Sequence, residues 1–223
     1  MKNTKFPTIF IVALAVIIIG GVLYTMSIHK QTTVPVVANT QTISDGNITL
    51  GYSSKDFVLA KDPSQILVSS TIQPCSEKFD YCLYYNGADY VGTNFETAGL
   101  RIQKLTTLST MPTCLATQPD GFSGLTPDTQ TVGDYAVSTF SPMSDAGAGH
   151  VASGALYRLW YKNTCYEFQT QIGQSQFANY PAGSIKEFTV ADRQELQAKL
   201  DALLNGITFP SGEKVMFPAA KRV

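Results

Sequence analysis

Charged residues are scarce in this sequence, and neither sign prevails. Asp, Glu, Lys and Arg make up 15% of the 223 residues, and the formal net charge at pH 7 is −1. A protein that binds the phosphate backbone of a nucleic acid usually carries a basic patch or stripe. The composition therefore argues against nucleic acid as a partner.

The sequence also lacks the short motifs of common metal and catalytic sites. Its four cysteines form no Cys-x2-Cys knuckle and lie far from both histidines, which argues against structural zinc. The acidic residues do not follow the alternating spacing of a calcium loop, and there is no Gly-x-Ser-x-Gly elbow. We therefore expect no metal ion and no cofactor, and we assign no catalytic residue.

One long uncharged run is present, at residues 6–26, directly after the short basic segment 1–5. A helix rises 1.5 Å per residue, so a run of this length covers about 30 Å, the thickness of the hydrocarbon core of a bilayer. The run has no polar face, which favours a transmembrane signal-anchor helix over a helix buried in a soluble core. The bilayer is therefore the expected partner of residues 6–26.

The charges that flank this run predict its orientation. Lys2 and Lys5 precede it, whereas His29 and Lys30 follow it, a modest bias that places the N-terminus in the cytoplasm. The run exceeds the 7 to 15 apolar residues of a typical cleaved signal peptide, which favours retention, although the sequence leaves cleavage open. We expect a single-pass protein of the cell membrane whose C-terminal domain is extracytoplasmic.

The rest of the chain divides into three parts by composition. Residues 27–46 are rich in Thr, Val and Asn without a helical period and predict an extended linker. Residues 47–209 carry the strand and helix patterns of one domain of ordinary size. Residues 210–223 follow a Pro-Ser-Gly break and predict a loose tail.

The domain pattern predicts an α+β fold. Phe and Tyr number 12 and 11, a composition that favours strands. The clearest hairpin covers residues 154–173, where alternation places Tyr166, Phe168 and Ile172 in the core. An amphipathic helix follows, with Thr189 and Asp192 as its N-terminal cap, and we expect its leucine stripe to pack on an antiparallel sheet. The stripe consists of Leu196, Leu200, Leu203 and Leu204.

All four cysteines fall inside this domain, at Cys75, Cys82, Cys114 and Cys165. An even number in an exported domain predicts two disulfides. Three pairings are open, and we favour Cys75 with Cys82 and Cys114 with Cys165.

The order of strands, aromatic hairpin YRLWYKNTCYEF and final helix LQAKLDALLNGITF loosely resembles the PsbP-like α/β sandwich over residues 47–209. The chain also resembles the uncharacterised single-anchor envelope proteins of bacteria. The resemblance to envelope proteins implies a location and no activity. The two expected disulfides are a departure from the PsbP-like pattern.

Three groups of residues are candidates for function. Two are aromatic loops that could bind an envelope protein or a glycan: Phe177, Asn179 and Tyr180 in one, and Tyr84, Tyr85 and Tyr90 in the other. They favour a non-catalytic binding domain of unknown specific function, although core packing is the competing interpretation of both. The third group, Ser144, Asp145 and His150, suggests the alternative of an anchored hydrolase.

Overall fold

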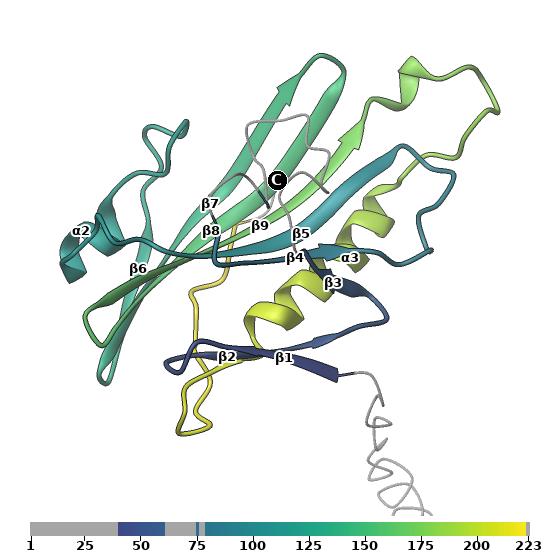
Figure 1. Ribbon diagram of the computed structural model, residues 1–223. Coiled ribbons are helices and arrows are strands. Elements are labelled where there is room, and N and C mark those ends of the chain that lie inside the picture. Colours follow the sequence, from purple (N-terminus) through teal and green to yellow (C-terminus); the bar gives the residue numbers. More distant parts are fainter. Residues whose placement is uncertain (1–39, 61–74, 76–78, 222–223) are drawn as a thin grey trace, which may run out of the picture. The chain divides into compact units, whose positions relative to one another are not determined.

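The computed structural model describes residues 40–60, 75 and 79–221 (Figure 1). The expected anchor at 6–26 and residues 27–39 of the expected linker lie outside these ranges. No helix within the described ranges has the length and apolar composition needed to cross a membrane.

Seven antiparallel strands form the main sheet. They are β3 (Phe57–Leu59), β4 (Tyr81–Tyr85), β5 (Phe95–Lys104), β6 (Asp128–Val132), β7 (Tyr135–Gly147), β8 (His150–Tyr161) and β9 (Thr164–Ser175). Their order across the sheet is β3-β4-β5-β9-β8-β7-β6. A smaller sheet joins β1 (Thr40–Ser44), β2 (Thr49–Ser53) and β10 (Ile207–Thr208), in the order β1-β2-β10.

The hairpin of β8 and β9 confirms the strongest strand prediction. Tyr161 pairs with Thr164, so Lys162 and Asn163 alone form the turn, with φ of 46° and 58°. Two residues in this left-handed region match the right-handed twist of the flanking strands. Tyr166, Phe168 and Ile172 are buried, as the alternation predicts.

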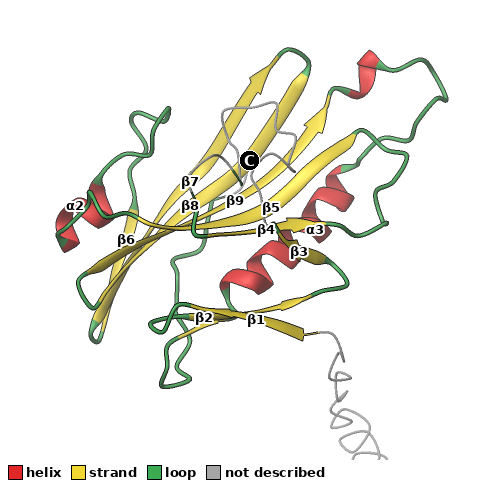
Figure 2. Ribbon diagram, viewed as in Figure 1, coloured by secondary structure: helices red, strands yellow, loops and turns green. Residues whose placement is uncertain are grey.

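Helix α3 (Val190–Leu204) covers one face of the main sheet (Figure 2). Thr189 and Asp192 form the predicted capping box, and all four leucines of the stripe are buried. The helix contacts β5 and β9 of the main sheet and β2 of the small sheet. The fold is therefore α+β, with an antiparallel sheet and a helix packed on it.

Two predicted boundaries differ from the structure. Residues 40–44, which the composition assigns to the linker, form β1 because they pair with β2 in a regular register. Residues 210–221 are not a loose tail, since Val215 is 1% exposed and the Phe217 ring contacts the rings of Tyr157 and Phe168. These apolar side chains are too few to reveal a period in the sequence.

The opposite face of the main sheet carries a short helix, α2 (Met111–Ala116), inside the Thr-rich segment between β5 and β6. Cys114 on α2 pairs with Cys165 on β9, and Cys75 pairs with Cys82 on β4. The structure thus has the pairing that the sequence analysis favours. The Cys114–Cys165 bridge ties α2 to the centre of the sheet.

Candidate functional site

The face of the main sheet that carries α2 has a polar centre. Residues 165–173 of β9 are all buried, so both faces of this strand are covered. On the α2 face, Glu167 pairs with Gln103 of β5 and Arg158 of β8. One row further along, Gln169 pairs with Arg101 of β5 and Leu156 of β8. Charged and amide side chains therefore occupy a position where an apolar core is usual.

Two arginines share the carboxylate of Glu167. Arg101 donates from Nη2 to Oε1, and Arg158 donates from Nε and Nη2 to Oε2, at 3.1 and 3.0 Å. Burying a charge is costly unless it is paired and hydrogen-bonded, and this arrangement satisfies both conditions for Glu167. The three side chains form what we term the Arg-Glu-Arg cluster.

The pKa of Arg101 in the Arg-Glu-Arg cluster differs from that of an arginine in water. Burial lowers the pKa of Arg101 from its usual value; the carboxylate of Glu167 opposes this, and the nearby charge of Arg158 adds to it. Two guanidinium groups thus share one carboxylate in a place of low solvent access.

A cavity of about 850 Å³ lies above this cluster. Arg101, Arg158, Glu167 and Gln169 line it from the sheet, together with residues 104–108 and 117–122 from the loops on either side of α2. Ligand cavities in proteins commonly enclose about 300–1,000 Å³. We term this space the central cavity.

Arg158 also holds the wall of the central cavity in place. Its Nη1 donates to the carbonyl oxygens of Cys114 and Thr117, at 3.0 and 2.7 Å. These carbonyls lie at the C-terminal end of α2, where a helix leaves acceptors unsatisfied. Together with the Cys114–Cys165 bridge, this fixes α2 to the sheet.

Gln169 presents its side chain to the central cavity. The residue is 6% exposed and lines the cavity. Its amide is not one of the buried side-chain groups that lack a hydrogen-bond partner in the described part of the chain, so the amide is open to the cavity.

The predicted aromatic loops take different positions. Tyr85 and Tyr90 are buried in the main core, so they do not form the predicted binding surface, whereas Tyr84 packs partly buried beside the Cys75–Cys82 pair. Phe177 and Tyr180 are 40% and 39% exposed, on the loop after β9. That loop docks on the β7–β8 turn.

The docking contacts of this loop are specific. Asn179 donates from Nδ2 to the Gly149 carbonyl, and the Tyr180 hydroxyl lies 2.8 Å from the hydroxyl of Ser175. Asn179 and Tyr180 thus serve at least partly to position the loop. Phe177 remains an exposed apolar side chain on this loop.

The structure does not assemble a triad from Ser144, Asp145 and His150. Ser144 and Asp145 are consecutive residues of β7, so their side chains point to opposite faces of the sheet. His150 begins β8, and its Nδ1 lies 2.6 Å from Oε1 of Glu96. The histidine is therefore engaged with a different carboxylate.

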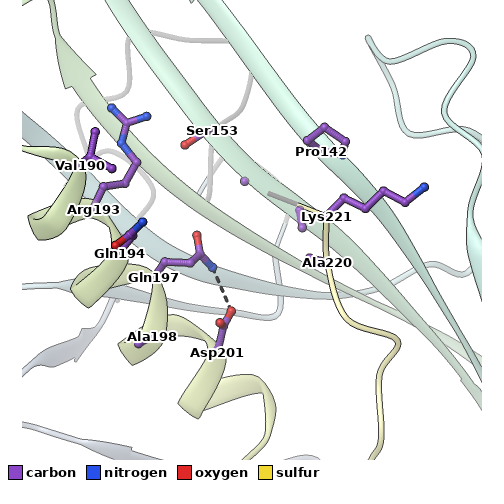
Figure 3. A pocket seen from close by; sticks show the side chains of 12 residues that line it. Pro142, Ser153, Val190, Arg193, Gln194, Gln197, Ala198, Asp201, Ala220 and Lys221 are labelled. Carbon is purple, nitrogen blue, oxygen red and sulfur yellow. Dashed lines mark hydrogen bonds between the residues drawn. The ribbon is translucent and has the colours of Figure 1, made fainter. Parts of the chain in front are cut away.

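A second cavity, of about 390 Å³, lies between α3, β8 and the C-terminal segment (Figure 3). Two of its polar side chains are bonded within the chain: Arg193 donates from Nη2 to Gln174, and Gln197 donates to Asp201 at 3.0 Å. Nε of Arg193 is buried and has no hydrogen-bond partner in the described part of the chain. Small residues, including Gly154, Ala155 and Ala198, form much of the remaining wall. This smaller cavity offers fewer groups to a ligand than the central cavity does.

Sequence reasoning missed the central cavity. The signal was present in CYEFQTQIG, residues 165–173, where Glu and Gln alternate with Tyr, Phe and Ile. Such alternation is typical of a strand with one solvent-facing side. Only the position of β9 in the middle of a sheet with covered faces shows that these polar residues are buried.

Among residues 40–60, 75 and 79–221, no group of three or more His, Cys, Asp or Glu side chains is placed to hold a metal ion. The sequence matches no protein-family model, and no curated protein is significantly similar to it.

Proposed function

We propose that the chain is a membrane-anchored, extracytoplasmic binding protein whose domain holds a small polar ligand in the central cavity, without catalysis. The observation that carries the proposal is the floor of the central cavity, where the Arg-Glu-Arg cluster and the side chain of Gln169 line a space of about 850 Å³.

The polar centre also differs from what stability alone favours. Replacing a buried ion pair by apolar residues of similar volume is often neutral or stabilising. A sheet centre that keeps two arginines and a glutamate beside a cavity of about 850 Å³ is therefore better explained by a binding role. Binding sites are built from such precisely placed polar groups.

The location is proposed on separate grounds. The uncharged run at 6–26 is long enough to span a bilayer. All four cysteines are paired, which suits an oxidising compartment outside the cytoplasm. Both features are expected of a domain held at the outer side of a cell membrane.

Native mass spectrometry of the full-length chain, purified in detergent from membranes, tests the binding function. We expect an added mass that is released on denaturation. Thr107 lines the central cavity and is exposed, so its replacement should not disturb the core. In a Thr107→Trp variant, the bulky ring at the cavity wall should block the ligand, and the added mass should be absent.

Thr129→Trp is the matched control. Thr129 is an exposed threonine on the edge strand β6 and does not line the central cavity. This variant should keep the added mass. If the parent chain carries no added mass, or if Thr107→Trp keeps it, the central cavity is not the binding site.

A further inference from the structure

We infer that the central cavity binds a neutral carbohydrate of about the size of a disaccharide, through the side-chain amides and hydroxyls of its lining. The inference rests on the proposed function and names the chemical class of the ligand. Three properties of the lining carry it: its charges are paired within the chain, it offers neutral hydrogen-bonding groups, and apolar side chains lie among these groups.

The charged side chains of the cavity already have partners of opposite charge. Both guanidinium groups of the Arg-Glu-Arg cluster donate to its one carboxylate, and the negative charge of Asp120 also acts on Arg101. Lys104 places its Nζ 2.8 Å from Oδ2 of Asp45. A charged ligand would leave water without meeting an unpaired counter-charge, which is costly. The lining therefore favours a ligand without net charge.

Neutral hydrogen-bonding groups stand beside these ion pairs. Amides and hydroxyls line the cavity from β5, β9 and the loops on both sides of α2; they belong to Gln103, Gln169, Thr106, Thr107 and Thr117. Each of these side chains both donates and accepts hydrogen bonds. The hydroxyl groups of a sugar do the same, so they can bond to either kind of side chain.

The two amides are placed to act on one ligand. Gln103 of β5 pairs with Glu167 of β9, and Gln169 of β9 pairs with Arg101 of β5, so the four side chains share one face of the sheet. Gln103 and Gln169 are thus diagonal neighbours, with Cβ atoms about 7 Å apart. A single sugar ring, or two linked rings, can reach both amides at once.

The apolar part of the lining suits the faces of a sugar ring. Phe122 lines the cavity and packs against a buried cluster that includes Met143 and Leu156, which line the cavity as well. The C–H groups of a sugar face can rest on an aromatic ring while the hydroxyls at its edge bond to polar groups. The volume of about 850 Å³ lies high in the range of about 300–1,000 Å³ for drug-sized ligands, which suits two linked rings better than one.

The test is isothermal titration of the full-length chain, in a detergent without a sugar head group, with maltose, N,N′-diacetylchitobiose and citrate as probes. At least one disaccharide should bind with a dissociation constant below about 1 mM, and citrate should not bind. Because no ligand charge is involved, the affinity should change less than twofold between about 50 and about 500 mM salt.

Gln169→Met removes an amide from the floor and keeps the approximate size of the side chain. It should weaken binding of the disaccharide by about tenfold, as expected when one or two hydrogen bonds are lost. Gln130→Met is the matched control, because Gln130 is an exposed residue of the edge strand β6 and does not line the cavity. Equal affinities of these two variants would overturn the inference.

Phe122→Leu tests the apolar contact, since it removes the ring but keeps an apolar side chain. It should also weaken binding, whereas Phe177→Leu, which removes an exposed ring outside the cavity, should leave the affinity unchanged. Binding that is lost in Phe177→Leu and kept in both Phe122→Leu and Gln169→Met would place the carbohydrate on the loop after β9 and overturn the inference.

The outcomes separate the inference from the proposed function. If neither disaccharide binds, but native mass spectrometry shows an added mass that Thr107→Trp removes, the cavity is a ligand site and the carbohydrate inference is wrong. Binding of citrate alone would have the same meaning. If no probe binds and no added mass is found, both the inference and the proposed function fail.

Discussion

Arg158 and Glu167 face each other across β8 and β9, and the guanidinium of Arg158 donates twice to the same carboxylate oxygen, Oε2. The same guanidinium donates to two carbonyl groups at the end of α2. A single arginine therefore connects the charge at the floor of the central cavity to the helix that forms part of its surroundings.

Replacing Glu167 by Gln should be strongly destabilising. The change removes the carboxylate that Arg101 and Arg158 share, and breaking a buried ion pair costs about 3–5 kcal/mol. Urea unfolding of the full-length chain measures the loss. Glu187→Gln, at an exposed loop position, should change the free energy of unfolding by less than about 0.5 kcal/mol. Similar free energies of unfolding for the two variants would show that the ion pairs of the Arg-Glu-Arg cluster contribute little to stability.

The two disulfides should contribute unequally. Cys114 and Cys165 are separated by 51 residues, whereas Cys75 and Cys82 are separated by 7. Chain entropy predicts losses of about 4 and about 2 kcal/mol when each pair is replaced by Ala. Thermal unfolding of the two double variants gives the order. The Cys114→Ala/Cys165→Ala variant should also bind its ligand more weakly, because α2 loses one of its attachments to the sheet.

Asp45 should make stability depend on pH in the acid range. Burial alone would raise its pKa, but the bond from Lys104, the backbone N–H groups of Ile48 and Asn47, and the Tyr166 hydroxyl together lower it below 3.8. The folded-state pKa is depressed, so the stabilisation is complete above pH 3.8 and is lost as pH falls through the folded-state pKa.

Asp45→Asn measures this contribution. At pH 7 the variant should be less stable than the parent chain by about 2 kcal/mol, the value of charge-assisted hydrogen bonds. The difference should shrink as the pH is lowered below the usual range for an aspartate. A difference that stays constant down to pH 2 would assign the loss to packing instead.

The C-terminal segment should contribute to stability. Val215 is 1% exposed, whereas its neighbour Met216 is 58% exposed. Val215→Ala removes two buried methyl-sized groups and should cost about 2 kcal/mol. Met216→Ala is the matched control and should be nearly neutral. Chemical denaturation of both variants distinguishes a docked segment from a loose tail, for which neither change would matter.

The proposed location predicts the state of the thiols. In protein purified from membranes, the intact N-terminal peptide should be detected. All four cysteines should resist alkylation until they are reduced. Mass spectrometry with alkylation before and after reduction measures both. Four thiols that react directly would place the domain in a reducing compartment.

The sequence predicts the fold well where a strand or helix pattern repeats over many consecutive residues. The β8–β9 hairpin and α3, with its Thr189 cap, follow from alternation, turn chemistry and a leucine stripe. The pairing of Cys114 with Cys165 also agrees with the sequence analysis. These features depend on residues close together in the chain, or on the small number of ways to pair four cysteines.

The candidate site could not be predicted in this way. Arg158 and Glu167 lie on the predicted hairpin of β8 and β9, but nothing near Arg101 in the sequence indicates that β5 pairs with β9. Tyr85 and Tyr90 illustrate the converse error, since an aromatic loop and an aromatic core have the same composition. In both cases the position of each strand in the sheet determines which side chains meet and which are buried, and the local sequence does not show that position.

The small sheet joins the two ends of the domain. Leu50 of β2 pairs with Ile207 of β10, so β2, which pairs with β1 on one side, finds its second partner only near the end of the chain. In a domain that is exported starting from its anchored end, β1 and β2 would cross the membrane well before β10. The domain would then complete its fold only after almost all of it had been translocated, and the early strands would depend on slow, long-range pairing or on a chaperone at the outer surface.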